Sequence, residues 1–183
     1  MENEMIPGLL VAMPSLQDSY FEKTVVLMLN YNSNGAFGVV INKNSNNLIK
    51  DLLVNKDNVN SDKFNFPLLL GGPVQTDSFW ALHSPDFSGE SSTTVSTNIS
   101  ISSAQEVLLA IVGDEGPQQL HIGCGYAGWG PGQLDREIED ESWWLMPLNE
   151  SLVMTTEHKK QWEIMIHDLG IDPLMAFIKS GTV

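Results

Sequence analysis

Cysteine and arginine are the scarcest chemically informative residues in this sequence. Its 183 residues include a single cysteine, Cys124, and a single arginine, Arg136. One cysteine excludes an intrachain disulfide framework and a cysteine-rich zinc site. Cys124 is the only thiol available as a nucleophile, and its acidic surroundings would raise its pKa. We therefore favour a half-buried cysteine that behaves as a small apolar residue.

Positive charge is also scarce. Nine lysine and arginine residues stand against 23 aspartate and glutamate residues, which gives a formal net charge of −14. Proteins that bind nucleic acid gain affinity from lysine and arginine side chains that displace phosphate counterions. The nearest approach to a basic run is the pair Lys159-Lys160. Direct binding of nucleic acid is therefore not expected.

Long apolar runs are absent as well. No segment approaches the ~20 apolar residues that a membrane-spanning helix requires, and residues 1–8 lack the basic and apolar regions of a signal peptide. We expect a cytoplasmic protein with no membrane segment. Hydrophobic residues make up 42% of the chain, and no linker interrupts it, so the sequence predicts a single domain over residues 1–183.

Familiar catalytic and metal-binding motifs are missing. The sequence has no Gly-x-Ser-x-Gly elbow, no phosphate loop and no His-Glu-x-x-His helix. The four histidines, at 83, 121, 158 and 167, have no metal-ligand spacing. We therefore predict no catalytic set, no metal and no cofactor. Whether the protein is an enzyme stays open, with a non-enzymatic role favoured.

Apolar runs and alternation predict the strands, while helical spacing and capping signals predict the helices. The predicted strands are 9–13, 23–31, 36–42, 67–70, 79–83, 93–96, 99–101, 118–123, 143–146 and 151–154. The predicted helices are 48–54, one from the capping box Ser103-x-x-Glu106 to Gly113, 131–141, one from Thr155 or Thr156 to Gly170, and one from Asp172-Pro173 onward. The order lacks a regular βαβα alternation. It predicts an α+β fold, with a mixed or antiparallel, barrel-like sheet and helices packed outside.

The most unusual stretch is His121–Trp144, in which glycines alternate with aromatic residues and an acidic segment follows. Its Gly123-x-Gly125-x-x-Gly128 matches the dinucleotide fingerprint. However, Trp129 and Pro131 interrupt the passage into a helix, and the acidic residue at the required distance would be Glu150. We interpret the stretch as a turn that joins a strand to an acidic helix.

Two glycine-rich segments that follow strands suggest a cleft. If the Gly71-Gly72-Pro73 turn meets the later glycines in space, polar and aromatic side chains nearby would line a small ligand site. The candidate cleft residues are Asn42, Gly71, Gly72, Pro73, His83, Tyr126, Trp129 and Gln133. Glycines used only for close backbone packing explain the same residues, and we favour that alternative.

Four blocks of the sequence together resemble one protein family. They are Pro7-Gly-Leu-Leu-Val-Ala-Met-Pro-Ser, Gly35-Ala-Phe-Gly-Val-Val-Ile-Asn, Gly71-Gly-Pro-Val with Leu82-His83, and Gly125-Tyr-Ala-Gly-Trp-Gly-Pro-Gly-Gln-Leu. Their order and spacing are similar to those of the bacterial AlgH/YqgE family. The resemblance implies a single α+β domain around a barrel-like sheet. That family is often labelled a transcriptional regulator, and no catalytic residues are established for it.

The first functional hypothesis is a regulatory or binding protein that acts through a protein partner or a small ligand, without binding DNA directly. The alternative is an enzyme, of hydrolase or transferase type, that uses a cleft near His83, Tyr126 and Trp129. His83 closes an apolar strand beside polar residues, so it could act as a base, although a hydrogen-bonded strand end is the more common role.

Overall fold

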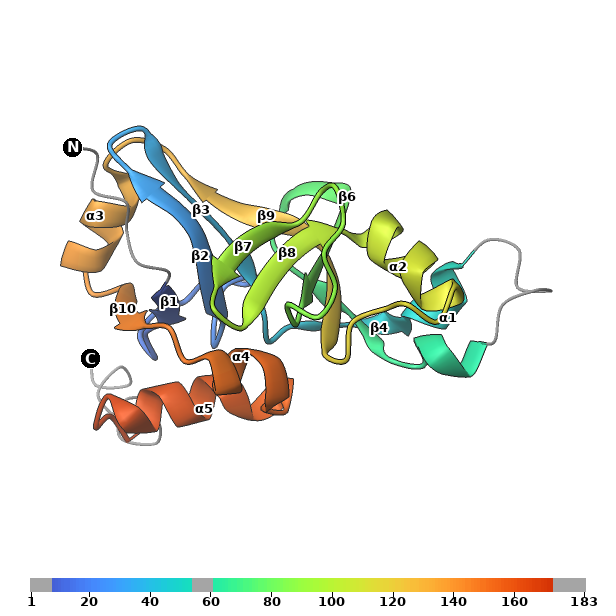
Figure 1. Cartoon of the computed structure of the whole chain (residues 1–183). Coiled ribbons are helices and arrows are strands. Elements are labelled where there is room, and N and C mark those ends of the chain that lie inside the picture. The colour runs from blue at the N-terminus through green and yellow to red at the C-terminus, as the bar shows by residue number, and fades with distance from the viewer. Residues whose placement is uncertain (1–7, 54–60, 173–183) are drawn as a thin grey trace.

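A computed structural model describes residues 8–53 and 61–172. It contains ten strands and five α-helices among these residues, arranged as a curled sheet with the helices outside it (Figure 1). The strands are β1 (Gly8–Ala12), β2 (Val25–Asn32), β3 (Gly35–Val40), β4 (Asn44–Leu48), β5 (Pro67–Leu70), β6 (Val74–His83), β7 (Thr93–Ser96), β8 (Ile99–Ser103), β9 (Leu120–Trp129) and β10 (Trp143–Pro147). The helices are α1 (Ile49–Leu52), α2 (Ala104–Val112), α3 (Gln133–Glu139), α4 (Glu150–Thr155) and α5 (His158–Asp168), with a 3-10 turn, η2, at Ser61–Phe64. The predicted α+β class is confirmed.

The sheet is organised around β9. Its main path runs β10-β1-β2-β3-β9-β6-β8-β7, and β4 and β5 pair with each other beside it. The first half of β9 pairs with β6 on one side and with β5 on the other, while its second half pairs with β3. Every pairing is antiparallel except that of β5 with β9. The predicted mixed sheet is therefore correct.

Both faces of the sheet are buried, which explains the continuous apolar runs of its inner strands. In β1, Leu9 and Val11 belong to one core cluster, which includes side chains of α4 and α5. Leu10 and Ala12 point to a second cluster, closed by α3 and aromatic residues. A third cluster lies under α2 at the far end of the sheet. Figure 1 shows the corresponding separation, with α3 at one end, α1 and α2 at the other, and α4 and α5 along one side.

The structure corrects the prediction for the glycine stretch. Residues 120–129 form one uninterrupted strand, β9, and not a strand followed by a turn. Only Gly130, Pro131 and Gly132 connect it to α3, with Gly132 in the left-handed conformation at φ 65°. A dense run of glycines is a turn signal when only the sequence is known. Here the glycines are required by backbones that pack closely on β9, and the sequence does not reveal those contacts.

One further prediction is wrong in type, and two neighbouring segments also differ from the prediction. Residues 151–154 form part of helix α4, because the Asn149 side chain accepts a hydrogen bond from the Leu152 amide and so caps a helical turn. Strand β4, at Asn44–Leu48, is not among the predicted strands. The predicted helix 48–54 shrinks to the single turn α1 within its described part.

Helix α2 forms as predicted, but its capping box does not. The Ser103 side chain makes no capping bond. The Glu106 carboxylate instead binds backbone amides of the loop that precedes β7. Its Oε1 accepts from the Glu90 amide at 2.6 Å and its Oε2 from the Ser91 amide at 3.1 Å. Helix α5 begins at His158, after Glu157, not at the predicted threonines. The helix predicted from 172–173 lies outside the described residues, apart from Asp172. None of the described helices is long and apolar enough to cross a membrane.

Candidate functional site

The two glycine segments meet in space, as the cleft hypothesis required. The Gly71 amide donates to the Cys124 carbonyl at 2.8 Å. A Cβ atom on Gly72 would lie 1.9 Å from the backbone carbon of Tyr126, and one on Gly125 would lie 2.3 Å from the Gly72 oxygen. Backbone therefore packs directly on backbone at this junction, which is the close-packing alternative and leaves no space there for a ligand.

Trp80 fills the rest of this junction. Its indole Nε1 donates to the Gly125 carbonyl at 2.8 Å. Its ring lies so close to Gly71 and Gly123 that a Cβ on either would come within 2.6 or 2.2 Å of its Cζ2 atom. These two glycines are thus explained by the bulk of one tryptophan. Sequence reasoning missed Trp80, because no sequence pattern links it to Gly71 in the preceding turn or to Gly123 on a strand much later in the chain.

The fingerprint Gly123-x-Gly125-x-x-Gly128 lies wholly inside β9. A pyrophosphate site of this kind needs a loop between a strand and a helix N-terminus, with free backbone amides. Here the strand pairs with β5 and β6 on its first half and with β3 on its second. The next helix begins only at Gln133. The segment therefore lacks the geometry of a dinucleotide loop.

Two of the cleft candidates have structural partners. The Asn42 side chain accepts from the Val25 amide at 2.8 Å and donates to the Lys23 carbonyl at 2.9 Å, which fixes the start of β2. The Gln133 side chain accepts from the Gly130 amide and donates to Glu137, at 3.0 and 2.9 Å. Neither side chain lines a described pocket with the other candidates.

His83 is completely buried. Its Nδ1–H donates to the Ser84 carbonyl at 2.9 Å, which leaves Nε2 to accept from the Ser102 hydroxyl at 2.8 Å. Ser102 in turn lies 2.7 Å from the Ser92 hydroxyl, so a chain of hydrogen bonds ties the loop before β7 to the sheet. The ring of Phe87 closes over the imidazole. A substrate cannot reach His83 in this arrangement.

Tyr126 and Trp129 do line one pocket together. It is a shallow hollow of about 520 Å³ over the β2–β3 hairpin, and its other walls include Phe37, Val74 and asparagines of the hairpin. Tyr126 packs edge-on against Phe37, whereas the Trp129 indole is buried and donates to Glu137 at 2.8 Å. Pro73 is exposed and directly precedes Val74, the first residue of β6 and one wall of this pocket.

Cys124 is buried, and burial raises the pKa of its thiol. It lies in the cluster under α2, among Ile122, Leu68 and other apolar side chains. A thiol with a raised pKa is mostly protonated near neutral pH and is a poor nucleophile. These surroundings match the interpretation of Cys124 as a small core residue.

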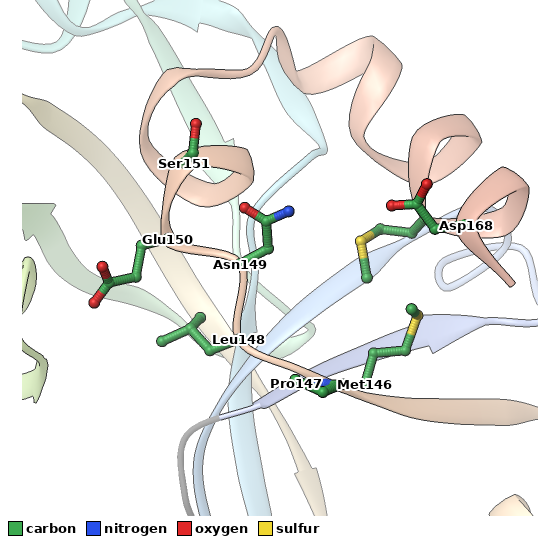
Figure 2. Close-up of a pocket in the computed structure, with 8 residues that line it drawn as sticks. Met146, Pro147, Leu148, Asn149, Glu150, Ser151 and Asp168 are labelled. Carbon is green, nitrogen blue, oxygen red and sulfur yellow. The ribbon is translucent and has the colours of Figure 1, made fainter.

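A polar pocket of about 600 Å³ lies between β10, α4 and α5 (Figure 2). Asn149 in its wall caps α4, and Glu150 accepts two bonds from Asn98, at 3.2 and 2.6 Å. Figure 2 shows the carboxylates of Glu150 and Asp168 on opposite sides of the hollow. The pocket therefore presents no pair of carboxylates placed for acid–base work.

An apolar groove of about 400 Å³ lies at the α2 end of the molecule. We call it the α2 groove. It is lined by Ile49, Leu52, Leu53, Phe64, Phe79, Ala104, Gln105, Leu108, Leu109, Val112 and Ile122. Several of these side chains are open to solvent, and Leu109 is 66% exposed. Four exposed large apolar side chains gather here, namely Leu52, Phe79, Leu109 and Val112, and a patch of this kind is typical of a binding site.

Two histidines meet beside a separate pocket of about 410 Å³, where β4, β9 and the start of α5 converge. The Nδ1 atom of His121 lies 3.2 Å from the Nε2 atom of His158. The other nitrogen of His121 faces the Met154 carbonyl at 3.1 Å, and that of His158 faces the Asn44 Oδ1 atom at 2.7 Å. Sequence reasoning did not pair these histidines, which are 37 residues apart without a motif. No group of three or more histidine, cysteine, aspartate or glutamate side chains within residues 8–53 and 61–172 could hold a metal ion.

Burial depresses the proton affinity of both histidines. It lowers the pKa of His121, and it lowers that of His158 to about 4, with the neighbouring His121 as a second cause. Both imidazoles are therefore neutral near pH 7. A neutral imidazole has one nitrogen that carries hydrogen and one that carries a free lone pair.

Known proteins match this chain along almost its whole length. Residues 9–174 match the model of the family described as AlgH-like. A UPF0301 protein of Laribacter hongkongensis is 36% identical over 174 residues, which cover 94% of either chain. One from Shewanella loihica is 33% identical over 168 residues and 90% of either chain.

Solved structures match as well. The AlgH protein of Pseudomonas aeruginosa, described as UPF0301, superposes with a TM-score of 0.76 at 29% identity, covering 97% of this chain and 94% of its own. A Corynebacterium diphtheriae protein, at 21% identity and a TM-score of 0.73, shares the fold over 96% of this chain and 93% of its own. The family match spans the sheet, its glycine junction and the helices around it. This chain belongs to the AlgH-like family.

Proposed function

We propose that the protein is a regulatory binding protein, which acts by docking a positively charged amphipathic segment of a partner protein in the α2 groove. The observation that carries the proposal is the exposed apolar lining, above all Leu109 and Val112 on α2 and Phe79 on β6. An amphipathic helix that lays its apolar face into such a groove is a recurring mode of recognition. The proposal needs no direct contact with DNA.

The charge around the groove favours a basic partner. The elements that form it, and the turn after α2, carry more carboxylates than lysines: Asp51, Asp62, Asp77, Glu106, Asp114 and Glu115 stand against Lys50 and Lys63. The whole chain, including these residues, has a formal net charge of −14. Complementary charge speeds the encounter and rejects acidic partners, and its effect falls with added salt. An anionic ligand such as DNA would meet repulsion here.

The test uses two synthetic helical peptides of about 18 residues, long enough to form a helix on the surface. One carries leucines on one face and lysines on the other, and its control replaces every lysine with glutamate. We expect fluorescence anisotropy to show binding of the lysine peptide, weakened by salt, and much weaker binding of the glutamate peptide. Equal binding of both peptides, or none of the lysine peptide, would contradict the proposal.

Substitutions then locate the binding site. Leu109→Ser removes an exposed side chain that a partner would bury. Because burying a whole leucine contributes about 1.5–3 kcal/mol, and two thirds of this one is exposed, affinity should fall about 5- to 30-fold. Ile164→Ser, an exposed apolar residue on α5, is the matched control and should leave affinity unchanged. An unaltered affinity of Leu109→Ser would place binding elsewhere. Tight, sequence-specific DNA binding in a mobility-shift assay at physiological salt would also overturn the proposal.

A further inference from the structure

The His121–His158 pair poses a proton-counting problem. A carbonyl oxygen can only accept a hydrogen bond, so the Met154 carbonyl requires the hydrogen of His121 to be on Nε2. The Oδ1 atom of Asn44 likewise requires the hydrogen of His158 to be on Nδ1. The two remaining nitrogens, which face each other at 3.2 Å, then both carry lone pairs. Two lone pairs at this distance repel, so either a cation lies between them, or the Asn44 amide is reversed and His158 Nε2 donates to His121 Nδ1.

We propose that His121 Nδ1 and His158 Nε2 bind one divalent transition-metal ion, with Zn²⁺ as the best fit. Two nitrogens at the usual ~2.0–2.1 Å from a tetrahedral zinc ion are about 3.3–3.4 Å apart, close to the 3.2 Å between these atoms. Imidazole nitrogen is a ligand that suits zinc, copper and nickel. The spacing therefore needs only a small opening to admit the ion.

The second nitrogen of each ring has the partner that a metal ligand needs. In metal sites, a coordinating histidine nearly always donates its other N–H to a carbonyl or carboxylate oxygen, which fixes the tautomer and the ring orientation. Met154 and Asn44 provide such oxygens at 3.1 and 2.7 Å. Met154 belongs to α4 and Asn44 to β4, so two different elements hold the two imidazole rings in place.

A metal ion binds the neutral imidazole through the nitrogen that carries the free lone pair. The adjoining pocket, lined by Thr156, Glu157 and Lys159 among others, gives access to the remaining coordination positions. A site with two protein ligands keeps these positions open for water or for an exogenous ligand.

The site is independent of the proposed docking function, because the α2 groove and this pocket share no lining residue. The outcome of the peptide experiment therefore does not bear on it, and zinc binding is measured on the full chain without peptide. Calorimetric titration with Zn²⁺ is carried out in excess Mg²⁺, which occupies the many surface carboxylates. We expect one saturable site per chain.

Single substitutions assign the ligands. His121→Gln and His158→Gln should each weaken Zn²⁺ binding at least tenfold, and Asn44→Ala, which removes an orienting oxygen, about 10- to 100-fold. His167→Gln is the matched control, because this exposed histidine lies on the same helix, α5, away from the pair. It should bind zinc like the unaltered protein. Circular dichroism of each variant verifies that it is folded.

Nuclear magnetic resonance of the imidazole nitrogens supplies a second readout that does not depend on the variants. On addition of Zn²⁺, the signals of His121 Nδ1 and His158 Nε2 should shift, while those of His167 stay in place. The inference is refuted if saturating Zn²⁺ leaves both signals unchanged, or if His158→Gln binds zinc undiminished. The inference is also refuted if His158 Nε2 carries a hydrogen in the presence of zinc. The Asn44 amide would then be reversed, so that its nitrogen donates to His158 Nδ1.

Discussion

Replacing Gly125 by alanine tests the central packing feature of the molecule. Gly125 has φ 71°, a left-handed conformation that costs an alanine about 1–2 kcal/mol. The added Cβ would also lie 2.3 Å from the Gly72 oxygen and 3.1 Å from the Val74 oxygen. Both neighbours are backbone atoms of β6 and of the turn before it, so they cannot rotate away as a side chain would.

The two effects can be separated with Gly170. This residue, just after α5, has nearly the same φ, 73°, but a Cβ there would meet no atom within 4 Å. Gly170→Ala therefore carries the conformational cost alone, partly offset by the reduced entropy of the unfolded chain, and should lose at most about 1 kcal/mol. Gly125→Ala adds an overpacking cost of about 1–3 kcal/mol or more. We expect it to lose about 2–4 kcal/mol, a large share of a typical unfolding free energy of about 5–15 kcal/mol.

Chemical denaturation with guanidinium chloride, followed by tryptophan fluorescence, measures both variants against the unaltered protein. The Trp80 indole, which donates to the Gly125 carbonyl, makes fluorescence sensitive to this region. If Gly125→Ala lost no more free energy than Gly170→Ala, the backbones would not be in contact at Gly125. The account of β9 as a strand packed against the Gly71–Gly72 turn would then be wrong.

Two further predictions concern α3. Glu137→Gln should destabilise the protein by about 1.5–3 kcal/mol in the same assay. The Glu137 carboxylate accepts hydrogen bonds from the indoles of both Trp129 and Trp143, and a neutral amide there would lose an ionic hydrogen bond. An unchanged denaturation midpoint would contradict this role. Tyr31, which donates to Asp135, has its pKa raised to about 12 by burial and then by this hydrogen bond. Because the folded pKa is above the ordinary value of 10, this stabilisation is complete below pH 10 and is lost as the pH rises toward 12. Ultraviolet titration should show that Asp135→Asn lowers the pKa of Tyr31. An unaltered pKa of Tyr31 would exclude the Asp135 carboxylate as a cause of the shift.

The zinc proposal and the docking proposal concern opposite faces of strand β9. The α2 groove lies over the end formed by α1, α2 and β6, whereas the histidine pair joins β4, β9 and α5. Strand β9 contributes to both, through Ile122 in the groove and His121 beside it in the metal pocket. Adjacent residues of a strand point to opposite faces, so one strand can serve two separate sites.

Local pattern was sufficient for most of the fold. Strong apolar runs bounded by turn residues placed β1, β2, β3 and β5 correctly, and the spacing of apolar residues placed α2 and α5. The failures were the glycine-rich second half of β9 and the short segments 44–48 and 151–154. Residues 151–154 are a four-residue apolar run, which fits a strand or a buried helix equally well until the capping contact of Asn149 is known.

The sequence alone determined the fold class, the deficit of positive charge and the family. The tertiary structure alone decided what the glycines and histidines do, since their partners are distant in sequence. Positions 71, 123 and 125 require glycine because Trp80 or a neighbouring backbone occupies the space that a Cβ atom would take. His121 and His158 meet only because α5 folds back against β9, which brings two of their ring nitrogens to 3.2 Å. Periodicity records which face of an element is buried, but not which atom of another element it will meet.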